Sequence, residues 1–194
     1  MKSLNVRKFL LILIFASAIG FAACGGDSDS DSGTPPPVAG LYAKASPTGN
    51  DTPITGVAVN DVAAAIARVN LAGAANDGAY TLVMDADVSA GSQTLSVSNR
   101  QLTIIGIGGE REITRTGTGR HFTVGSSGKT ITLTLGKNIT LQGHDNNDTN
   151  SVVHVQNGAN FIMLAGSKVI DNERTSGMGG GVNVKWSNVY HEWR

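Results

Sequence analysis

A parallel β-helix, an all-β solenoid, is the fold class that this sequence predicts, and three observations lead to it. Short runs of β-branched and large apolar residues alternate with polar residues from His121 to Val184, which is typical of strands. Gly, Asn, Asp or Ser separates each run from the next. The pattern also repeats: Val153-His-Val155 returns as Val182-Asn-Val184, 29 positions later (182 − 153), and Phe122-Thr-Val124 precedes it by 31 (153 − 122). A period of about 30 residues containing three short strands indicates stacked coils.

Stacking is the physical reason for such a repeat. A single coil cannot bury its own inward side chains, whereas stacked coils pair each strand with its equivalent about 4.8 Å above and below. The turns then place Gly and Asn where positive φ angles are needed. An antiparallel sandwich is the alternative, because it also contains many short strands. Two-residue hairpin signals are scarce in this chain, which favours the β-helix.

The coils are expected from residue 79 to residue 184. The predicted strands are 80–84, 94–97, 102–105, 122–124, 130–135, 139–141, 152–155, 161–163, 169–170 and 181–184. The glycine-rich stretch Gly106–Arg111 is interpreted as a turn between coils, since it lacks the glycine and lysine pattern of a nucleotide-binding loop.

An N-terminal cap with one α-helix is predicted at residues 40–78. Residues 40–55 contain Pro47 and Pro53 and are expected to be irregular, and the helix is expected at about 60–70. Asn60 suits the N-cap position and Asp61 suits the positive end of the helix dipole. The apolar residues that share one face of this helix are Val62, Ile66 and Val69. Such a helix would cover the open first coil, as capping units do in solenoids. A helix that binds a partner protein is the alternative.

Two stretches carry a resemblance to a known family. The segment Phe161–Asn172, followed by Gly179–Val184, resembles the repeats of bacterial surface lipoproteins with pectin-lyase-like right-handed β-helices. The segment Leu133–Gly143 resembles the preceding coil in the same family. This resemblance covers about residues 40 to 184 and implies a short right-handed β-helix. It says little about activity, because one fold hosts many functions.

The first 39 residues predict export and a lipid anchor. Residues 1–23 have positive charges followed by an apolar run that begins at Phe9, as in a signal peptide. Phe21-Ala-Ala-Cys24 resembles a lipobox, so Cys24, the single cysteine of the chain, is the predicted lipidation site. A plain signal peptide with an incidental cysteine is the alternative. Residues 24–39 are rich in Asp, Ser and Pro and are predicted to form a disordered tether. We expect an outer-membrane or cell-surface location.

Few residues indicate site chemistry. The loop Gly143–Asn150 carries oxygen ligands of the kind that Ca²⁺ prefers, and the weak candidates are Asp145, Asn147 and Asp148. A solvated loop is the competing interpretation. No cofactor is expected. The formal net charge is zero, so nothing in the composition indicates nucleic-acid binding.

Charged residues gather in three further places that we interpret as surface charge. They are Asp85 and Asp87; Glu110, Arg111, Glu112 and Arg115; and Asp171, Glu173 and Arg174. His121 and His154 alternate with apolar neighbours, so their side chains are expected to point outward. No nucleophile or metalloprotease motif is present, and no catalytic residue is assigned.

The combined reading is a membrane-anchored surface lipoprotein with a display or binding role, such as adhesion. Besides the membrane itself, its expected partner is a glycan or a host or matrix protein. A polysaccharide lyase or hydrolase is one alternative, because such enzymes share the architecture. A truncated remnant without a separate function is the other.

The tail, residues 185–194, breaks the pattern of the coils and holds both tryptophans of the chain, Trp186 and Trp193. One permitted set of codons for the tail, read one base later, spells Asn-Gly-Ala-Thr-Phe-Thr-Met, which resembles Asn157-Gly-Ala-Asn-Phe-Ile-Met163. We therefore predict that a frameshift near Lys185 replaced a further coil, and that the tail is poorly ordered or lies loosely over the last coil. An aromatic cap formed by the two tryptophans is the alternative.

Overall fold

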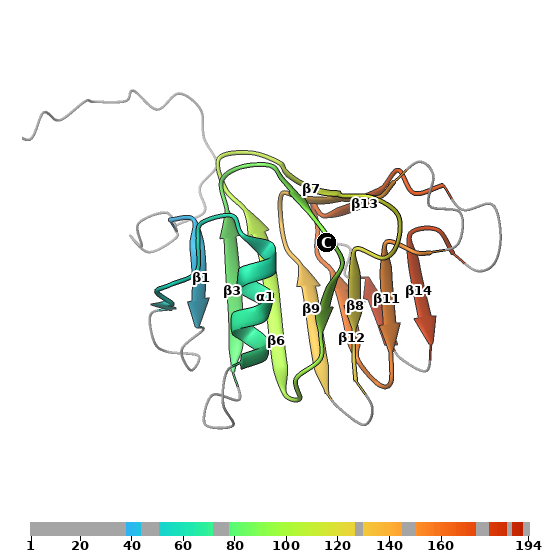
Figure 1. Ribbon diagram of the computed structural model, residues 1–194, viewed down its shortest axis with the longest axis horizontal. Coiled ribbons are helices and arrows are strands. Elements are labelled where there is room, and N and C mark those ends of the chain that lie inside the picture. Colours follow the sequence, from blue (N-terminus) through green and yellow to red (C-terminus); the bar gives the residue numbers. More distant parts are fainter. Residues whose placement is uncertain are drawn as a thin grey trace, which may run out of the picture. The chain divides into compact units, whose positions relative to one another are not determined.

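The computed structural model describes residues 38–43, 51–71, 78–126, 130–144, 150–173, 179–185 and 188–191, the last of these as backbone only. These residues belong to one compact unit that extends from Pro36 to Arg194. They form a right-handed parallel β-helix with one α-helix near its start, as the sequence predicts (Figure 1). None of the described helices is long and apolar enough to cross a membrane.

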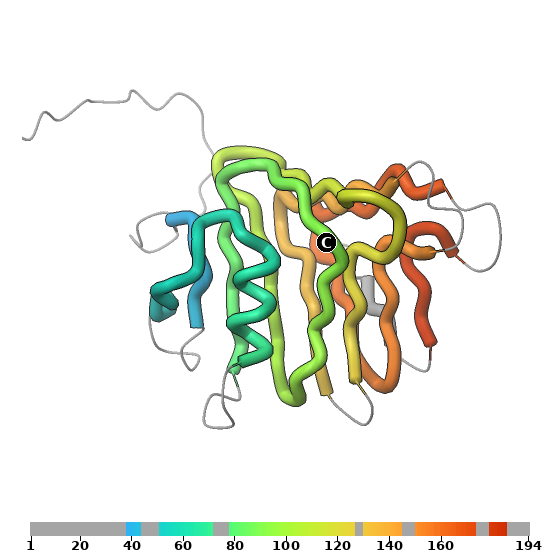
Figure 2. The backbone as a smooth tube through the Cα atoms, in the orientation of Figure 1, coloured from blue at the N-terminus to red at the C-terminus, as the bar shows by residue number. Residues whose placement is uncertain are grey.

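Three sheets form the walls of the solenoid, and the chain visits them in the fixed order A, B, C. Sheet A contains β1 (Gly40–Ala43), β2 (Thr52–Pro53), β3 (Ala79–Met84), β6 (Arg100–Gly106), β9 (Ile131–Leu135), β12 (Asn160–Met163) and β15 (Asn188–His191). Sheet B contains β4 (Val88–Ala90), β7 (Arg111–Arg115), β10 (Ile139–Gln142) and β13 (Lys168–Ile170). Sheet C contains β5 (Gln93–Leu95), β8 (Phe122–Val124), β11 (Val153–Gln156) and β14 (Val182–Lys185). The path from coil to coil can be followed in Figure 2.

The repeat seen in the sequence sets the register of the coils. Val153 pairs with Phe122 on one side and with Val182 on the other, both in parallel strands. These are the equivalences that the repeat of about 30 residues predicts. Because the pairs are parallel and in register, like side chains stack in columns along the solenoid.

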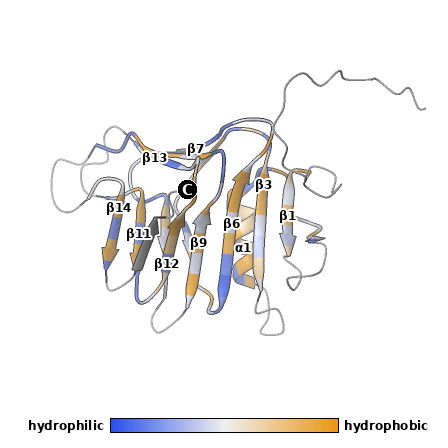
Figure 3. Ribbon diagram, turned by 180° about the vertical axis from the view of Figure 1, so that it is seen from behind, coloured by the Kyte–Doolittle hydropathy of each residue, from blue (hydrophilic) through white to orange (hydrophobic). Residues whose placement is uncertain are grey.

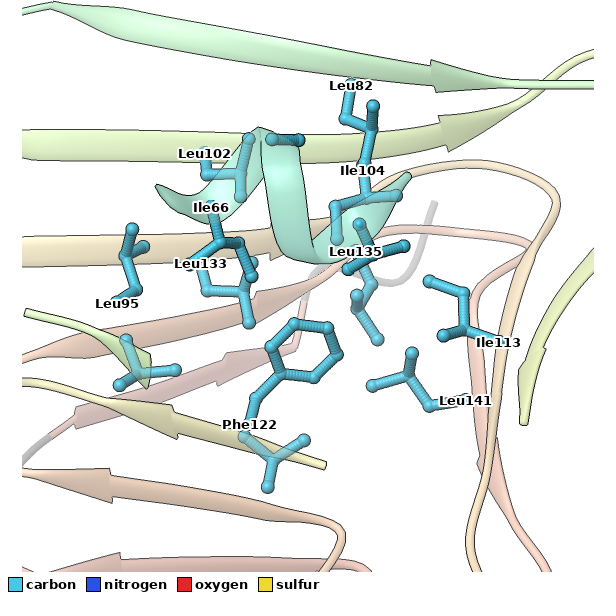
Figure 4. Close-up of a cluster of buried hydrophobic side chains, with 14 of the residues drawn as sticks. Ile66, Leu82, Leu95, Leu102, Ile104, Ile113, Phe122, Leu133, Leu135 and Leu141 are labelled. Atoms are coloured by element: carbon cyan, nitrogen blue, oxygen red, sulfur yellow. The ribbon is translucent and has the colours of Figure 1, made fainter. Parts of the chain in front are cut away.

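Those columns form the core. Phe122, Leu133 and Leu141 come from the three different sheets, are fully buried, and point toward one another (Figure 4). Val153, Val155 and Phe161 are also fully buried, while Met163 and Val169 pack against the core at its C-terminal end. All five therefore point inward, as predicted. The interior is mainly apolar because most inward positions of these strands face other coil residues, although Arg100 on β6 and Arg115 on β7 are buried as well.

Helix α1 (Val62–Leu71) covers the start of the solenoid, and its predicted apolar face is buried. The N-cap prediction is wrong by one residue. Asp61 caps the helix, since its Oδ1 accepts a hydrogen bond from the Ala64 N–H at 2.8 Å. Asn60 has a φ of 62° and instead bonds to Asp85 through its side chain, with 2.7 Å between Nδ2 and Oδ1. The backbone turns at Asn60, so its side chain is directed away from the helix.

Several strands lie where the sequence predicts none. Residues 40–55 contain β1 and β2 rather than irregular chain, and β1 runs antiparallel beside β3. Of the charged group around Arg111, Glu110 lies in the turn that precedes strand β7, while Arg111, Glu112 and Arg115 lie in the strand itself. In the tail, β15 pairs in parallel with β12, so the backbone there continues sheet A in place of the loose arrangement that we expected. The tryptophans of the tail lie outside the described residues, and the frameshift stays a prediction about the gene.

Candidate functional site

The outer face of sheet A carries two ranks of uncharged polar side chains, which we call the hydroxyl–amide face. Thr81, Thr103 and Thr134 are paired neighbours in the first rank. Gln101, Thr132 and Asn160 are paired neighbours in the second rank. The residues that alternate with them along the same strands, such as Leu102 and Leu133, point into the core. Members of a rank therefore lie about 4.8 Å apart, and the ranks lie about 7 Å apart.

The hydroxyl–amide face carries no charge, and its two ranks end at the apolar Ile162 and Ala79. Asn160 Nδ2 donates to Thr132 Oγ1 at 3.4 Å, which joins two coils within the second rank. Tyr42 of β1 pairs with Thr81 and extends the first rank with an aromatic ring. Figure 3 views the molecule from the side on which sheet A lies in front of α1. No outward position of β3, β6, β9 or β12 holds a charged residue.

The outer face of sheet B is different, because it carries an ion-paired carboxylate. Glu110 receives hydrogen bonds from Lys168 Nζ, at 2.9 Å to Oε1 and 2.8 Å to Oε2, and from the Thr140 hydroxyl. The bonds from Lys168, followed by the bond from Thr140, hold the pKa of Glu110 below its ordinary value. A general acid needs a raised pKa to keep its proton near neutral pH. Glu110 is therefore suited to a surface ion pair and not to proton donation.

The remaining predicted charge groups are distributed as follows. Asp85, Asp87, Asp171 and Glu173 are exposed. Asp87 Oδ1 accepts a hydrogen bond from the Glu112 N–H at 3.0 Å. This carboxylate, just before β4, thus pairs with a backbone N–H of β7. Arg174 lies outside the described residues.

The expectation that Arg115 is surface charge is wrong. Arg115 is only 9% exposed, and its guanidinium donates to the carbonyl oxygens of Ala90, Thr116 and Thr118. It lies two residues after the buried Ile113, so period two places it on the inner side of β7. This spacing could have identified Arg115 as the side chain that fills the corner between sheets B and C.

The expected outward orientation of His121 is also wrong. His121 is fully buried, its ring stacks on that of Phe122 with centroids 5.4 Å apart, and its Nε2 donates to the Ile113 carbonyl oxygen at 3.0 Å. His121 precedes β8 and lies at a bend, so the alternation of the strand does not extend to it. The pKa of His121 is lowered to about 4, mainly because the ring is buried away from water. The imidazole is therefore neutral at pH 7.

His154 occupies the outward position that alternation predicts, between the fully buried Val153 and Val155. Even so, it is only 8% exposed. Burial, followed by the charge of Arg120, lowers its pKa, while hydrogen bonds with Gln156 and Asn183 act in the opposite direction. His154 thus belongs to a polar ladder on the outside of sheet C, with Thr123 and Asn183 as its paired neighbours.

Neither predicted ligand site falls in the described part of the chain. Cys24 and the Ca²⁺ candidates Asp145, Asn147 and Asp148 all lie outside the described residues. Within those residues, no three His, Cys, Asp or Glu side chains form a group that could hold a metal ion. The hydroxyl–amide face is the arrangement that sequence reasoning missed, although the register between coils implies it.

No family model matches the chain, and comparisons with curated proteins and with solved structures return no significant match. The function is therefore argued from the faces described above.

The buried His121 should make the protein sensitive to mild acid. Unfolding returns its pKa to about 6.5, so the unfolded chain binds more protons than the folded one between about pH 6.5 and pH 4. This contribution to stability is complete above that window and is lost as the pH falls through it. Between pH 7 and pH 5, His121 should account for about 2 kcal/mol of lost unfolding free energy. Denaturant unfolding of wild type and His121→Gln at both pH values tests this, and an equal loss in both proteins would contradict it.

Proposed function

We propose that this protein is a lipid-anchored surface protein that binds a glycan through its hydroxyl–amide face. The observation that carries the proposal is the pair of uncharged polar ranks on sheet A. The first rank crosses β3, β6 and β9, and the second crosses β6, β9 and β12. Sugar hydroxyls both donate and accept hydrogen bonds, and so do threonine hydroxyls and the amides of Gln and Asn. A regular array of such groups fits an extended chain of sugars better than it fits a single small molecule.

A glycan is favoured over a host or matrix protein for two reasons. Protein interfaces are enriched in aromatic residues, Met and Arg at their centres, whereas this face holds threonines and amides flanked by the aliphatic Ile105 and Ile162. Tyr42, at the rim, offers one aromatic ring of the kind that can pack against the apolar side of a sugar. A glycan-cleaving role gains no support from Glu110, whose pKa is lowered and whose two oxygens are bound to Lys168.

The surface location rests on the N-terminal sequence and on the resemblance to bacterial surface lipoproteins. The lipobox-like Phe21–Cys24 and the acidic, proline-containing stretch after it fit an anchor and a spacer. A spacer of this composition would hold the β-helix away from the membrane and leave sheet A free to meet a ligand.

The test uses cells that produce the full chain and a panel of fluorescent glycans. Thr103→Lys places a long charged side chain at the centre of the first rank and should weaken binding by about ten-fold or more, because it removes a hydroxyl partner and keeps the ligand away from its neighbours. Thr114→Lys, on the outer face of sheet B, is the matched control and should bind as wild type does. In the same cells, Cys24→Ser should move the protein out of the membrane fraction.

Equal glycan binding by the two lysine variants would contradict the assigned face. Retention of Cys24→Ser in the membrane fraction would contradict the anchor alone. Binding of matrix proteins without any glycan, lost in Thr103→Lys, would support the face and overturn the ligand class.

A further inference from the structure

The first coil of the solenoid has one edge strand in each of the three sheets. Two of these edges are covered by other parts of the chain. In sheet A, β1 pairs with β3. In sheet C, α1 lies beside β5, and the Asn70 side chain replaces a strand: its Nδ2 donates to the Thr94 carbonyl at 2.8 Å, and its Oδ1 accepts from the Ser96 N–H at 3.2 Å. Sheet B ends at β4, and no strand in the described part of the chain pairs with the free side of β4.

The free side of β4 presents backbone groups at Ser89. Val88 and Ala90 face β7, since Ala90 accepts a hydrogen bond from the Thr116 N–H at 3.0 Å. In a parallel pair the residue between them turns both its N–H and its C=O to the opposite side. Ser89 therefore directs one donor and one acceptor away from sheet B. Its side chain is exposed.

A hollow of about 470 Å³ lies on this side of β4, between the strand and residues 58–63 of the cap. Val59, Val62 and Val88 contribute apolar surface to its walls. Val59 is 55% exposed, which is unusual for a valine placed beside a folded core. Backbone groups at a strand edge next to apolar walls are what an added β-strand uses for affinity and for side-chain selection.

The charge around the hollow is negative. Asp61 is one of its lining residues, and Asp85 and Asp87 lie next to others, with Asp85 bonded to Asn60. No lysine or arginine is among the residues that line the hollow, and the Arg115 guanidinium, which donates to the Ala90 carbonyl oxygen, is outnumbered by these three carboxylates. An anionic ligand is disfavoured, because Asp61 already occupies the start of α1. A ligand with positive charge is favoured by Coulomb attraction.

We propose that β4 accepts an extended segment of another polypeptide as an added strand, and that this segment carries small apolar side chains and at least one lysine or arginine. Residues 58–63 of the cap line the hollow across from β4, so the space beside the strand suits a single added strand better than the sheet of a second folded copy. This inference concerns a different surface from the hydroxyl–amide face and does not depend on glycan binding.

The test measures binding of two short peptides to the isotope-labelled full chain in detergent. One peptide alternates valine with lysine, and the other alternates valine with glutamate. The lysine peptide should bind and slow hydrogen exchange of the Ser89 amide, and the glutamate peptide should not. Ser89→Pro removes the N–H that the added strand needs and should weaken binding about ten-fold. A proline is compatible with this position, because the N–H of Ser89 is not used by β7.

Ser89→Ala is the matched control and should bind the lysine peptide as wild type does. A lysine peptide methylated at alternate backbone nitrogens provides the same test on the unaltered protein and should not bind. Failure of the lysine peptide to bind wild type would overturn the proposal. So would equal affinity of Ser89→Pro and Ser89→Ala, or a preference for the glutamate peptide.

Discussion

Replacing Phe122 with alanine should remove about 3–5 kcal/mol from the free energy of unfolding. Phe122 is fully buried between the inward side chains of the three sheets, and it also supports the His121 ring (Figure 4). Its neighbour in the next coil, Val153, is fully buried as well, so the cavity does not open to water on that side. Domains of this size commonly have a free energy of unfolding of only about 5–15 kcal/mol, so the variant should lose a large part of its stability.

Denaturant unfolding followed by circular dichroism measures this effect. Thr123→Ala is the matched control, since Thr123 is the next residue of β8 and points out of the coil. Surface substitutions of this kind usually change stability by about 0.5 kcal/mol or less. Equal losses from the two substitutions would mean that the inward and outward positions of β8 are assigned the wrong way round.

Replacing Gly125 with alanine should cost about 2–5 kcal/mol for two reasons that add. Gly125 has a φ of 116°, which lies outside the left-handed helical region that L-residues can adopt, and such a conformation costs an L-residue at least about 1–2 kcal/mol. A Cβ at this position would also lie 2.1 Å from the Gln156 carbonyl oxygen in the next coil. That atom belongs to the backbone, so relief requires the two coils to move apart, and overpacking typically costs about 1–3 kcal/mol.

Gly158→Ala separates these two contributions. Gly158 also has a positive φ, 81°, but no atom lies within 4 Å of the position that a Cβ would occupy. This variant should therefore lose only the backbone part, about 1–2 kcal/mol. Thermal or denaturant unfolding of both variants decides the matter, and a loss in Gly158→Ala as large as that in Gly125→Ala would show that crowding between coils contributes nothing.

Period two and the repeat of about 30 residues were enough to predict the core and the stacking of the coils. Val153, Val155 and Phe161 were placed inward from alternation, and the pairing of Val153 with Phe122 and Val182 followed from spacing. Both signals are local or strictly periodic, so one sequence suffices to detect them. The candidate site was harder to predict from the sequence. The hydroxyl–amide face exists only when Thr81, Thr103 and Thr134 are brought into register across unequal spacings of 22 and 31 residues (103 − 81 and 134 − 103).

The sequence by itself determined the fold class, most of the inward side chains and the helix that caps the first coil. The alternation of apolar and polar residues and the positions of the turn residues are properties of the sequence alone. Tertiary structure decided what happens at the corners and edges. Alternation stops at a bend, so the burial of His121 depended on the carbonyl of Ile113 on another sheet. The side chain of Asn70 closes the edge of β5, while no described strand closes that of β4, because these outcomes depend on where the cap rests against the first coil.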